Sequence, residues 1–389
     1  MGGSAFLYPM GGEVVTALHS SVPAETFMSK LKDDNYILRT LNYNLISYGF
    51  AKNDAFHTFE INVRALAGGS IPKEIFQIAK LGTAEKMYDL SNFRVMSNIY
   101  AELAYGYSRK LSDIVSVGVR GKLLVGLYSA NYNFRKFDVE MTEDVYRATI
   151  ESDMLVTNKL VNLVPDDEGL IDFTSFASKG RSLGPTAGGL AVDLGIEIKP
   201  VENLTVSASI LDLGGLFWYY GNAASTSSVI TFDGFKNVQV DQINESGLKN
   251  LLDGVKDDFL SSMKPKKLND FVRFYTVPFT ANLGFKYRSE FYDRLTVGAA
   301  GSYVGYKGMP YWDARLFVAV NPLEWLDFTA DVGYSTYGTV YGGALSLKLY
   351  NFRINAGLQN GVSGKIAYTS TKLNANSKTV TVGVTFDLK

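Results

Sequence analysis

The sequence predicts an all-β protein, an antiparallel transmembrane β-barrel built as a single domain from residues 1–389. Three observations predict this class. Many segments alternate apolar and polar residues with a period of two, which is typical of strands with one apolar face. Charged residues in these segments fall on the polar face, and the connections between segments are alternately short and long. A barrel that spans a membrane has all three properties.

The composition supports a sheet protein and excludes several other classes. The chain contains 24 Tyr, 24 Phe and 37 Gly, which suits aromatic girdles and tight turns. Its hydrophobic content of 46% is too high for a disordered chain. The net charge of −1 argues against nucleic acid as a partner, and the lack of Cys excludes disulfides, thiol catalysis and Cys-bound zinc. No apolar run is long enough to predict a membrane helix.

The strand pattern is clearest in the last segment, 377–389, where Val380, Val382, Val384 and Phe386 alternate with Thr and Gly. The same pattern predicts the remaining strands. In chain order, the expected strands are 43–50, 59–65, 99–107, 115–125, 190–198, 204–210, 275–287, 295–303, 312–320, 326–334, 341–349, 352–358 and 377–389. Short helices are expected at 24–31, 72–81 and 245–263.

The connections sort by length along the chain. Short turns are expected at 51–55, 110–113, 199–203, 288–294, 321–324 and 349–352, and long connections near 68–92, 131–186 and 214–270. All the short turns fall at one end of the strands and all the long connections at the other. Short periplasmic turns and long external loops are typical of bacterial barrels.

The directions of the strands add a further expectation. The first and the last strand both run toward the short turns, so they cannot pair as antiparallel neighbours. Bacterial single-chain barrels have even numbers of strands. We therefore expect about 14 strands in the full protein, with about 13 present here, and a signal peptide and a first strand ahead of residue 1.

Charged residues on the strands define the face that we expect to line the lumen. A cation facing lipid at the bilayer midplane costs about 2–4 kcal/mol, and an acid less. The predicted lumen-facing polar residues are Glu60, Arg64, Arg120, Lys122, Asp193, Glu197, Lys286, Asp313, Arg315, Asp331, Lys348 and Arg353. Asp212 and Arg273 depart from this pattern and are expected near strand ends. Because both signs occur, we expect a paired network, not a single-sign ion filter.

Few residues suggest a specific chemistry. The aromatic run Phe217, Trp218, Tyr219 and Tyr220 is interpreted as part of an interfacial aromatic belt, or alternatively as the lining of a ligand access route together with the helix at 245–263. His19 and His57 are weak candidates for catalysis, and the acidic residues 166–168 lack the full ligand spacing of a calcium loop. No catalytic, cofactor-binding or metal-binding residue is predicted, and we expect no enzyme activity and no cofactor.

Several stretches resemble a known family. They are 7–12 (LYPMGG), 31–50 (LKDDNYILRTLNYNLISYGF), 56–80 and 207–214 (SASILDLG), with Trp218. The chain resembles a family of Bacteroidota outer-membrane barrels of unassigned function. These resemble the fourteen-stranded barrels that include long-chain fatty-acid transporters and the lipoprotein-shuttle barrel of type IX secretion. The resemblance implies a bacterial outer-membrane location and supplies no catalytic or ligand residues.

The expected function is the binding or passage of a small, apolar ligand by a barrel in contact with outer-membrane lipid. The alternative is a structural or assembly barrel whose loops bind an external or periplasmic protein partner. A continuous apolar tunnel would favour the first, and a sealed lumen with an exposed apolar loop patch the second. A soluble protein of two stacked sheets is a third possibility.

Overall fold

The computed structural model describes residues 7–10, 13–82, 86–142, 146–159, 162–177, 184–232, 261, 264–268, 272–306, 309–336, 338–362 and 375–387. Most of these residues form strands, which confirms the all-β class. The predicted helix at 245–263 falls almost wholly outside the described residues. None of the helices in the described part of the chain is both long and apolar enough to cross a membrane.

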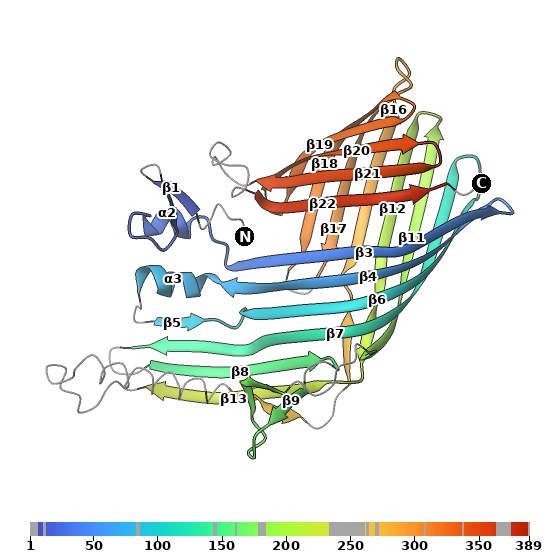
Figure 1. Ribbon diagram of the computed structural model, residues 1–389. Coiled ribbons are helices and arrows are strands. Elements are labelled where there is room, and N and C mark those ends of the chain that lie inside the picture. The colour runs from blue at the N-terminus through green and yellow to red at the C-terminus, as the bar shows by residue number, and fades with distance from the viewer. Residues whose placement is uncertain are drawn as a thin grey trace.

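The elements are labelled as in Figure 1. In the N-terminal half they are β1 (Leu7–Met10), β2 (Glu13–Thr16), α2 (Ala24–Met28), β3 (Asp34–Lys52), β4 (Ala55–Pro72), α3 (Lys73–Leu81), β5 (Lys86–Asp89), β6 (Arg94–Lys110), β7 (Val115–Met141), β8 (Tyr146–Thr157), β9 (Asn162–Pro165), β10 (Ile171–Ala177) and β11 (Ala187–Val201). They continue as β12 (Leu204–Trp218), β13 (Asn222–Phe232), β14 (Lys266–Leu268), β15 (Arg273–Thr276), β16 (Phe279–Arg288), β17 (Leu295–Gly305), β18 (Tyr311–Leu323), β19 (Leu326–Ser335), β20 (Gly338–Leu349), β21 (Phe352–Val362) and β22 (Ala375–Phe386).

A single curved sheet contains 18 strands (Figure 1). Thirteen of them form an unbroken series of antiparallel neighbours, in the order β3, β4, β6, β7, β11, β12, β16, β17, β18, β19, β20, β21 and β22. We call this series the wall. One sheet of this kind is incompatible with two stacked sheets.

The wall is not closed. No pairing register joins β3 to β22 among the described residues, although each has a neighbour on its other side. Each antiparallel step reverses the strand direction, so β3 and β22, at the two ends of a series of thirteen, run the same way. Figure 1 shows both arrows pointing toward the short turns.

The sheet has more strands than the sequence predicts. The additional strands β5, β8, β13 and β14 lie in segments expected to be long loops, and β15 overlaps the start of the strand expected at 275–287. The cause is the length of β7, which runs for 27 residues and pairs with β5 and β8 beyond the wall. The expectation of mainly loop structure is therefore wrong for the described residues of 131–186 and for 214–232, whereas residues 233–260 lie outside the described residues.

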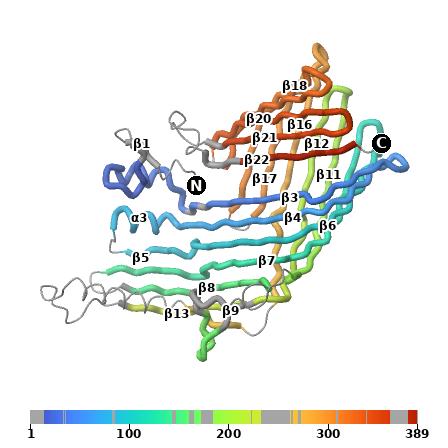
Figure 2. The backbone as a smooth tube through the Cα atoms, in the orientation of Figure 1, coloured from blue at the N-terminus to red at the C-terminus, as the bar shows by residue number. Residues whose placement is uncertain are grey.

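Local sequence explains the hairpin turns and the ends of the wall. Asn53 and Asp54 both have positive φ, 51° and 58°, which a two-residue type I′ hairpin turn requires. This turn and the other short turns of the wall lie at one end of the strands, and α2, α3 and β5 lie at the opposite end (Figure 2). There Phe27 of α2 packs edge-on against Phe76 of α3, with ring centroids 5.8 Å apart.

The two faces of the wall differ in burial. On β6, Met96, Asn98, Tyr100 and Glu102 are buried, whereas Tyr105 on the opposite face is 53% exposed. The buried face is enclosed by the curved sheet, because contacts between distant strands cross it. Tyr306 and Met309, which follow β17, pack against Leu66 of β4 and Met96 of β6. We call this the inner face.

Candidate functional site

An irregularity in β12 decides which residues reach the inner face. The register between β11 and β12 shifts between Val192 and Leu194, and Asp212 has a φ of 62°. Asp adopts this left-handed conformation more readily than most residues. One extra residue in a strand moves every later side chain to the opposite face. Ile210 is therefore exposed, while Asp212 and Trp218 are buried.

This bulge corrects the interpretation of Asp212. Asp212 is expected on the apolar side near a strand end, and this expectation is wrong. Asp212 lies within β12 and is 8% exposed on the inner face. The bulge also divides the aromatic run, because Trp218 is buried whereas Phe217 is 54% exposed and packs against Phe274.

A buried cation is held between two carboxylates on three adjacent strands. Lys122 Nζ on β7 lies 2.8 Å from Asp193 Oδ1 on β11 and also contacts Asp212 Oδ1 on β12. The three side chains are only 2%, 8% and 10% exposed. The backbone N–H of Asp212 donates a 2.8 Å hydrogen bond to Asp193 Oδ1. The bulge thus places its own residue to complete this buried group.

Further ion pairs extend this group across β4 and β6. Arg120 Nη2 lies 3.1 Å from Glu60 Oε1, and Arg120 Nη1 lies 3.9 Å from Asp193 Oδ2. Arg64 Nε lies 3.2 Å from Glu102 Oε1. We call these residues, together with the buried Lys122 group, the first ion cluster. It contains paired charges of both signs, so the inner face here presents no field of one sign.

A second ion cluster lies on the opposite part of the wall. Arg315 Nε on β18 lies 2.7 Å from Asp313 Oδ1, and Arg315 Nη1 lies 3.8 Å from Asp331 Oδ1 on β19. Gln359 on β21 donates a 3.1 Å hydrogen bond to the same carboxylate oxygen of Asp331. The bonds tie three strands together on the inner face.

The other predicted lumen residues lie apart from both clusters. Glu197 pairs with Lys199, at 3.1 Å, close to the short turn between β11 and β12. Lys286, Lys348 and Arg353 are exposed near the short-turn ends of their strands. Lys348 and Arg353 are direct neighbours in the register of β20 and β21. The structure therefore joins eight of the twelve predicted residues through ion pairs in two clusters: Glu60, Arg64, Arg120, Lys122, Asp193, Asp313, Arg315 and Asp331.

An apolar layer occupies the inner face next to the first ion cluster. It consists of Tyr100, Leu124, Ala187, Ala191, Leu216, Trp218 and Val277, with Tyr275 packed against them. On β7 the inward residues change from Arg120 and Lys122 to Leu124, so the layer begins where the charges end. Leu216 and Trp218 are completely buried.

Tyr275 connects this layer to the contacts that cross the interior. It packs against both the apolar layer and the group formed by Leu66, Met96, Tyr306 and Met309. Its hydroxyl lies 3.0 Å from the hydroxyl of Tyr306 and accepts a 3.3 Å hydrogen bond from Asn98 Nδ2. Strands from opposite sides of the wall therefore meet through an aromatic contact whose polar atoms are satisfied.

Trp218 differs from these tyrosines because its indole N–H has no acceptor among the residues that the structure describes. A Cβ atom on Gly126 would lie only 2.8 Å from Cζ3 and 2.9 Å from Cη2 of the indole. Those atoms are at the end of the ring away from Nε1. The ring therefore rests on the wall at Gly126, and its N–H is directed away from that contact.

The exposed members of the aromatic run lie outside the apolar layer. Tyr219 is 55% and Tyr220 48% exposed. Lys159 Nζ lies 5.4 Å from the centroid of the Tyr220 ring, a distance suited to a cation–π contact. The four aromatics do not form one site, because only Trp218 faces the interior.

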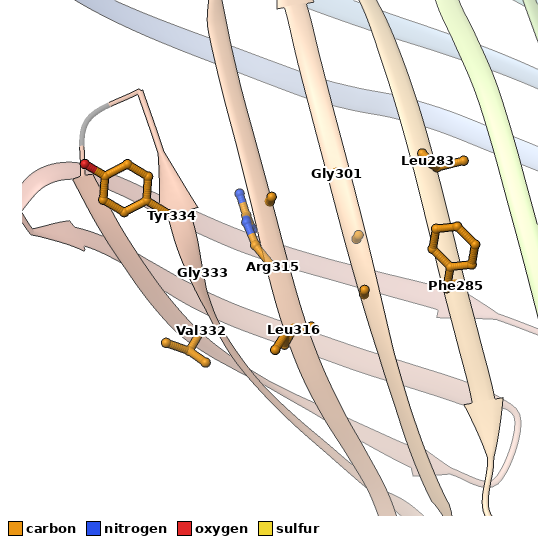
Figure 3. A pocket seen from close by; sticks show the side chains of 11 residues that line it. Leu283, Phe285, Gly301, Arg315, Leu316, Val332, Gly333 and Tyr334 are labelled. Carbon is orange, nitrogen blue, oxygen red and sulfur yellow. The ribbon is translucent and has the colours of Figure 1, made fainter.

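The outer face of β16–β19 carries a separate hollow of about 480 Å³. Its floor includes the small residues Ala299, Gly301 and Ala314. Larger side chains surround the floor, among them Phe285 and Tyr334, as Figure 3 shows. Its large apolar lining residues, such as Leu316 and Val332, are exposed on the outer face, and Arg315 of the second ion cluster also lines it.

The residues considered for other chemistry have structural partners. His57 lies near a short turn, stacks on Phe50 with centroids 4.9 Å apart, and shares a 2.7 Å hydrogen bond with the Tyr105 hydroxyl. His19 Nδ1 shares a 2.7 Å hydrogen bond with Ser21 Oγ in an exposed segment. Asp166 Oδ1 accepts the backbone N–H groups of residues 168 and 170, so it shapes a turn.

Comparison with known proteins finds solved structures of low similarity and one family. The Pseudomonas putida toluene transporter TodX shares 11% identity over 89% of this chain and 87% of its own, with a TM-score of 0.41. The Ralstonia pickettii toluene transporter TbuX shares 10% identity over 87% of both chains, also with a TM-score of 0.41. No curated protein matches the sequence. A family model matches residues 4–358, and the chain therefore belongs to the family of unknown function DUF5723.

Proposed function

We propose that this protein is a bacterial outer-membrane β-barrel that binds or passes small, apolar ligands. The observation that carries the proposal is the apolar layer on the inner face. A barrel whose lumen conducts only water or ions would be lined by polar side chains, whereas here Trp218 and Leu216 are buried on the inner face. Ligand sites are usually apolar with a few placed polar groups, which describes this layer and the adjoining Tyr275.

The outer face of the wall supports the membrane location. Large apolar side chains are exposed along the strands of the wall, for example Tyr43 at 58%, Leu194 at 48% and Leu316 at 64%. Soluble monomers rarely expose apolar patches beyond a few hundred Å². Here the exposed apolar face follows the whole wall, and the paired charges lie on the other face. A hydrocarbon surround stabilises this arrangement.

The proposal can be tested with tryptophan fluorescence, because the chain has only 3 Trp and they differ in place. Trp218 is buried, whereas Trp312 and Trp325 are 43% and 48% exposed. A W312F/W325F variant reports on the interior, and a W218F/W325F variant reports on partition into the surrounding detergent. Titration with ethylbenzene should give a saturable signal in the first variant and a linear one in the second. A linear response in both would contradict ligand binding in the apolar layer.

The unmatched N–H of Trp218 refines the expected ligand. A hydrogen bond adds about 0.5–1.5 kcal/mol of net free energy, or about 2- to 10-fold in affinity. Acetophenone has nearly the shape of ethylbenzene and adds one carbonyl acceptor. We expect it to bind more tightly by that factor in the W312F/W325F variant. Equal affinities would show that the indole N–H does not reach the ligand.

A protein-binding role is the second candidate, and one observation favours it. Apolar side chains are exposed at the end of the sheet that carries the long connections, namely Leu81 at 61%, Met87 at 67% and Val229 at 63%. These residues lie on α3, β5 and β13, outside the thirteen strands of the wall, so the lipid that surrounds the wall does not explain their exposure. If neither ethylbenzene nor acetophenone gives a saturable signal, this candidate replaces the first.

A further inference from the structure

The two edges of the wall face each other without pairing. The neighbour of β3 is β4, and the neighbour of β22 is β21, while the described residues show no register between β3 and β22. Figure 1 shows the two strands apart. We call the space between these edges the seam.

Side-chain exposure is consistent with an open edge on both sides of the seam. Val380 and Val382 of β22 are 70% and 73% exposed, compared with 40%, 44% and 54% for the outward Val297, Val318 and Val332 on interior strands of the wall. On β3, residues 41–51 are exposed on both faces of the strand, including the outward Leu41 at 59% and Tyr43 at 58%. A neighbouring strand would cover part of these side chains.

An open seam in a bilayer is costly. Each edge strand presents a row of backbone N–H and C=O groups to its missing neighbour, and each group left unsatisfied in hydrocarbon costs several kcal/mol. Closed barrels avoid this penalty because they have no edges. The membrane location proposed above therefore requires that something pairs with β3 and β22.

Strand direction excludes the two simplest partners. Direct pairing of β3 with β22 would be parallel, whereas every register in this sheet is antiparallel. A second copy inserted in the same membrane with the same orientation offers as free edges only its own β3 and β22, which run the same way, because rotation about the membrane normal preserves their direction. Neither arrangement continues the antiparallel pattern.

We propose that the seam binds one additional extended polypeptide segment that runs opposite to β3 and β22. To span the bilayer it needs about 9–11 residues. Its outward residues would be apolar, next to Tyr43 and Val382, and its inward residues small and polar, next to Asn42 and Thr381. A single strand of this chemistry satisfies both edges and makes the number of strands in the wall even.

Cysteine cross-linking measures the width of the seam. With one strand between them, the backbones of β3 and β22 are about 9.5 Å apart, which is twice the spacing of paired strands. A disulfide needs Cα atoms within about 7 Å. In the full chain reconstituted in vesicles, Tyr43→Cys should not form a disulfide with Val380→Cys, Val382→Cys or Val384→Cys. An Ala356→Cys/Val382→Cys pair, which are register neighbours, is the control.

Peptide addition tests the occupant. A synthetic copy of β21 runs opposite to β22 in the wall and has the required alternation, and a shuffled peptide of the same composition is the control. Binding of the copy should slow amide hydrogen exchange in both β3 and β22 by about fivefold or more, since each new hydrogen bond contributes about 1 kcal/mol. Efficient disulfide formation across the seam, or equal exchange with the copy and the shuffled peptide, would overturn the proposal.

Discussion

Replacement of Lys122 by Met should be the most damaging single change in the interior. Lys122 Nζ lies 2.8 Å from Asp193 Oδ1, and at an effective dielectric constant of about 20 this attraction alone is about 6 kcal/mol before desolvation is subtracted. Removing the cation leaves the carboxylates of Asp193 and Asp212 buried together without a partner. Breaking a buried ion group in this way costs about 3–5 kcal/mol.

The assay is equilibrium unfolding by urea in lipid vesicles, followed by circular dichroism of the sheet. Arg147→Ala is the matched control, because Arg147 and Glu140 form an ion pair that is 53% and 50% exposed and should contribute at most about 1 kcal/mol. A K122M/D193N/D212N variant should regain most of the lost stability, since it removes the buried charge altogether. If Lys122→Met lowers the free energy of unfolding no more than Arg147→Ala does, the Lys122 group is hydrated, and the claim that its charges are buried and mutually stabilising is wrong.

Two further changes test the apolar layer and the packing at the end with the long connections. Gly126→Ala should lower the free energy of unfolding by about 1–3 kcal/mol and shift the fluorescence emission of Trp218, because the added Cβ would lie 2.8 Å from the indole. Gly188→Ala on the adjacent strand is the control, because nothing lies within 4 Å of its added Cβ, and it should change neither quantity. Similar effects of the two substitutions would contradict the contact between Gly126 and the indole. Phe27→Ala removes a fully buried ring that packs on Phe76, so protease cleavage near α2 should become faster while the urea midpoint of the wall stays unchanged; a lower midpoint would show that this packing supports the wall itself.

The wall follows from the sequence because each strand has one face toward the interior and one away from it. A period of two is then visible without any knowledge of the partners, as in Val380, Val382 and Val384. Because one face of each strand is apolar, the charged residues lie on the other face, and there Glu60 and Arg120 form an ion pair. The strands beyond the wall, such as β8 and β13, are not predicted because their buried faces mix apolar and polar residues, as in Ile150 and Ser152 on β8, so the sequence shows no alternation of polarity.

Alternation of apolar and polar residues does not predict the faces of the residues that follow the bulge in β12. Apolar residues occupy even positions up to Ile210, and then Leu211 and Leu213 fall at odd positions, a change of parity that signals one inserted residue. Reading the strand as regular places both Asp212 and Trp218 on the outward side. Their positions depend on a backbone conformation that the pattern shows only as an interruption.

The ion cluster and the apolar layer are thus linked through one backbone irregularity. The residue at positive φ, Asp212, completes the buried Lys122 group, and the change of face that it causes turns Leu216 and Trp218 inward. The buried ion pairs stabilise the bulge, because straightening β12 would carry the Asp212 carboxylate away from Lys122. The polar contacts on one side of the bulge therefore hold the apolar surface on the other side in place, which is the surface that we propose as the ligand site.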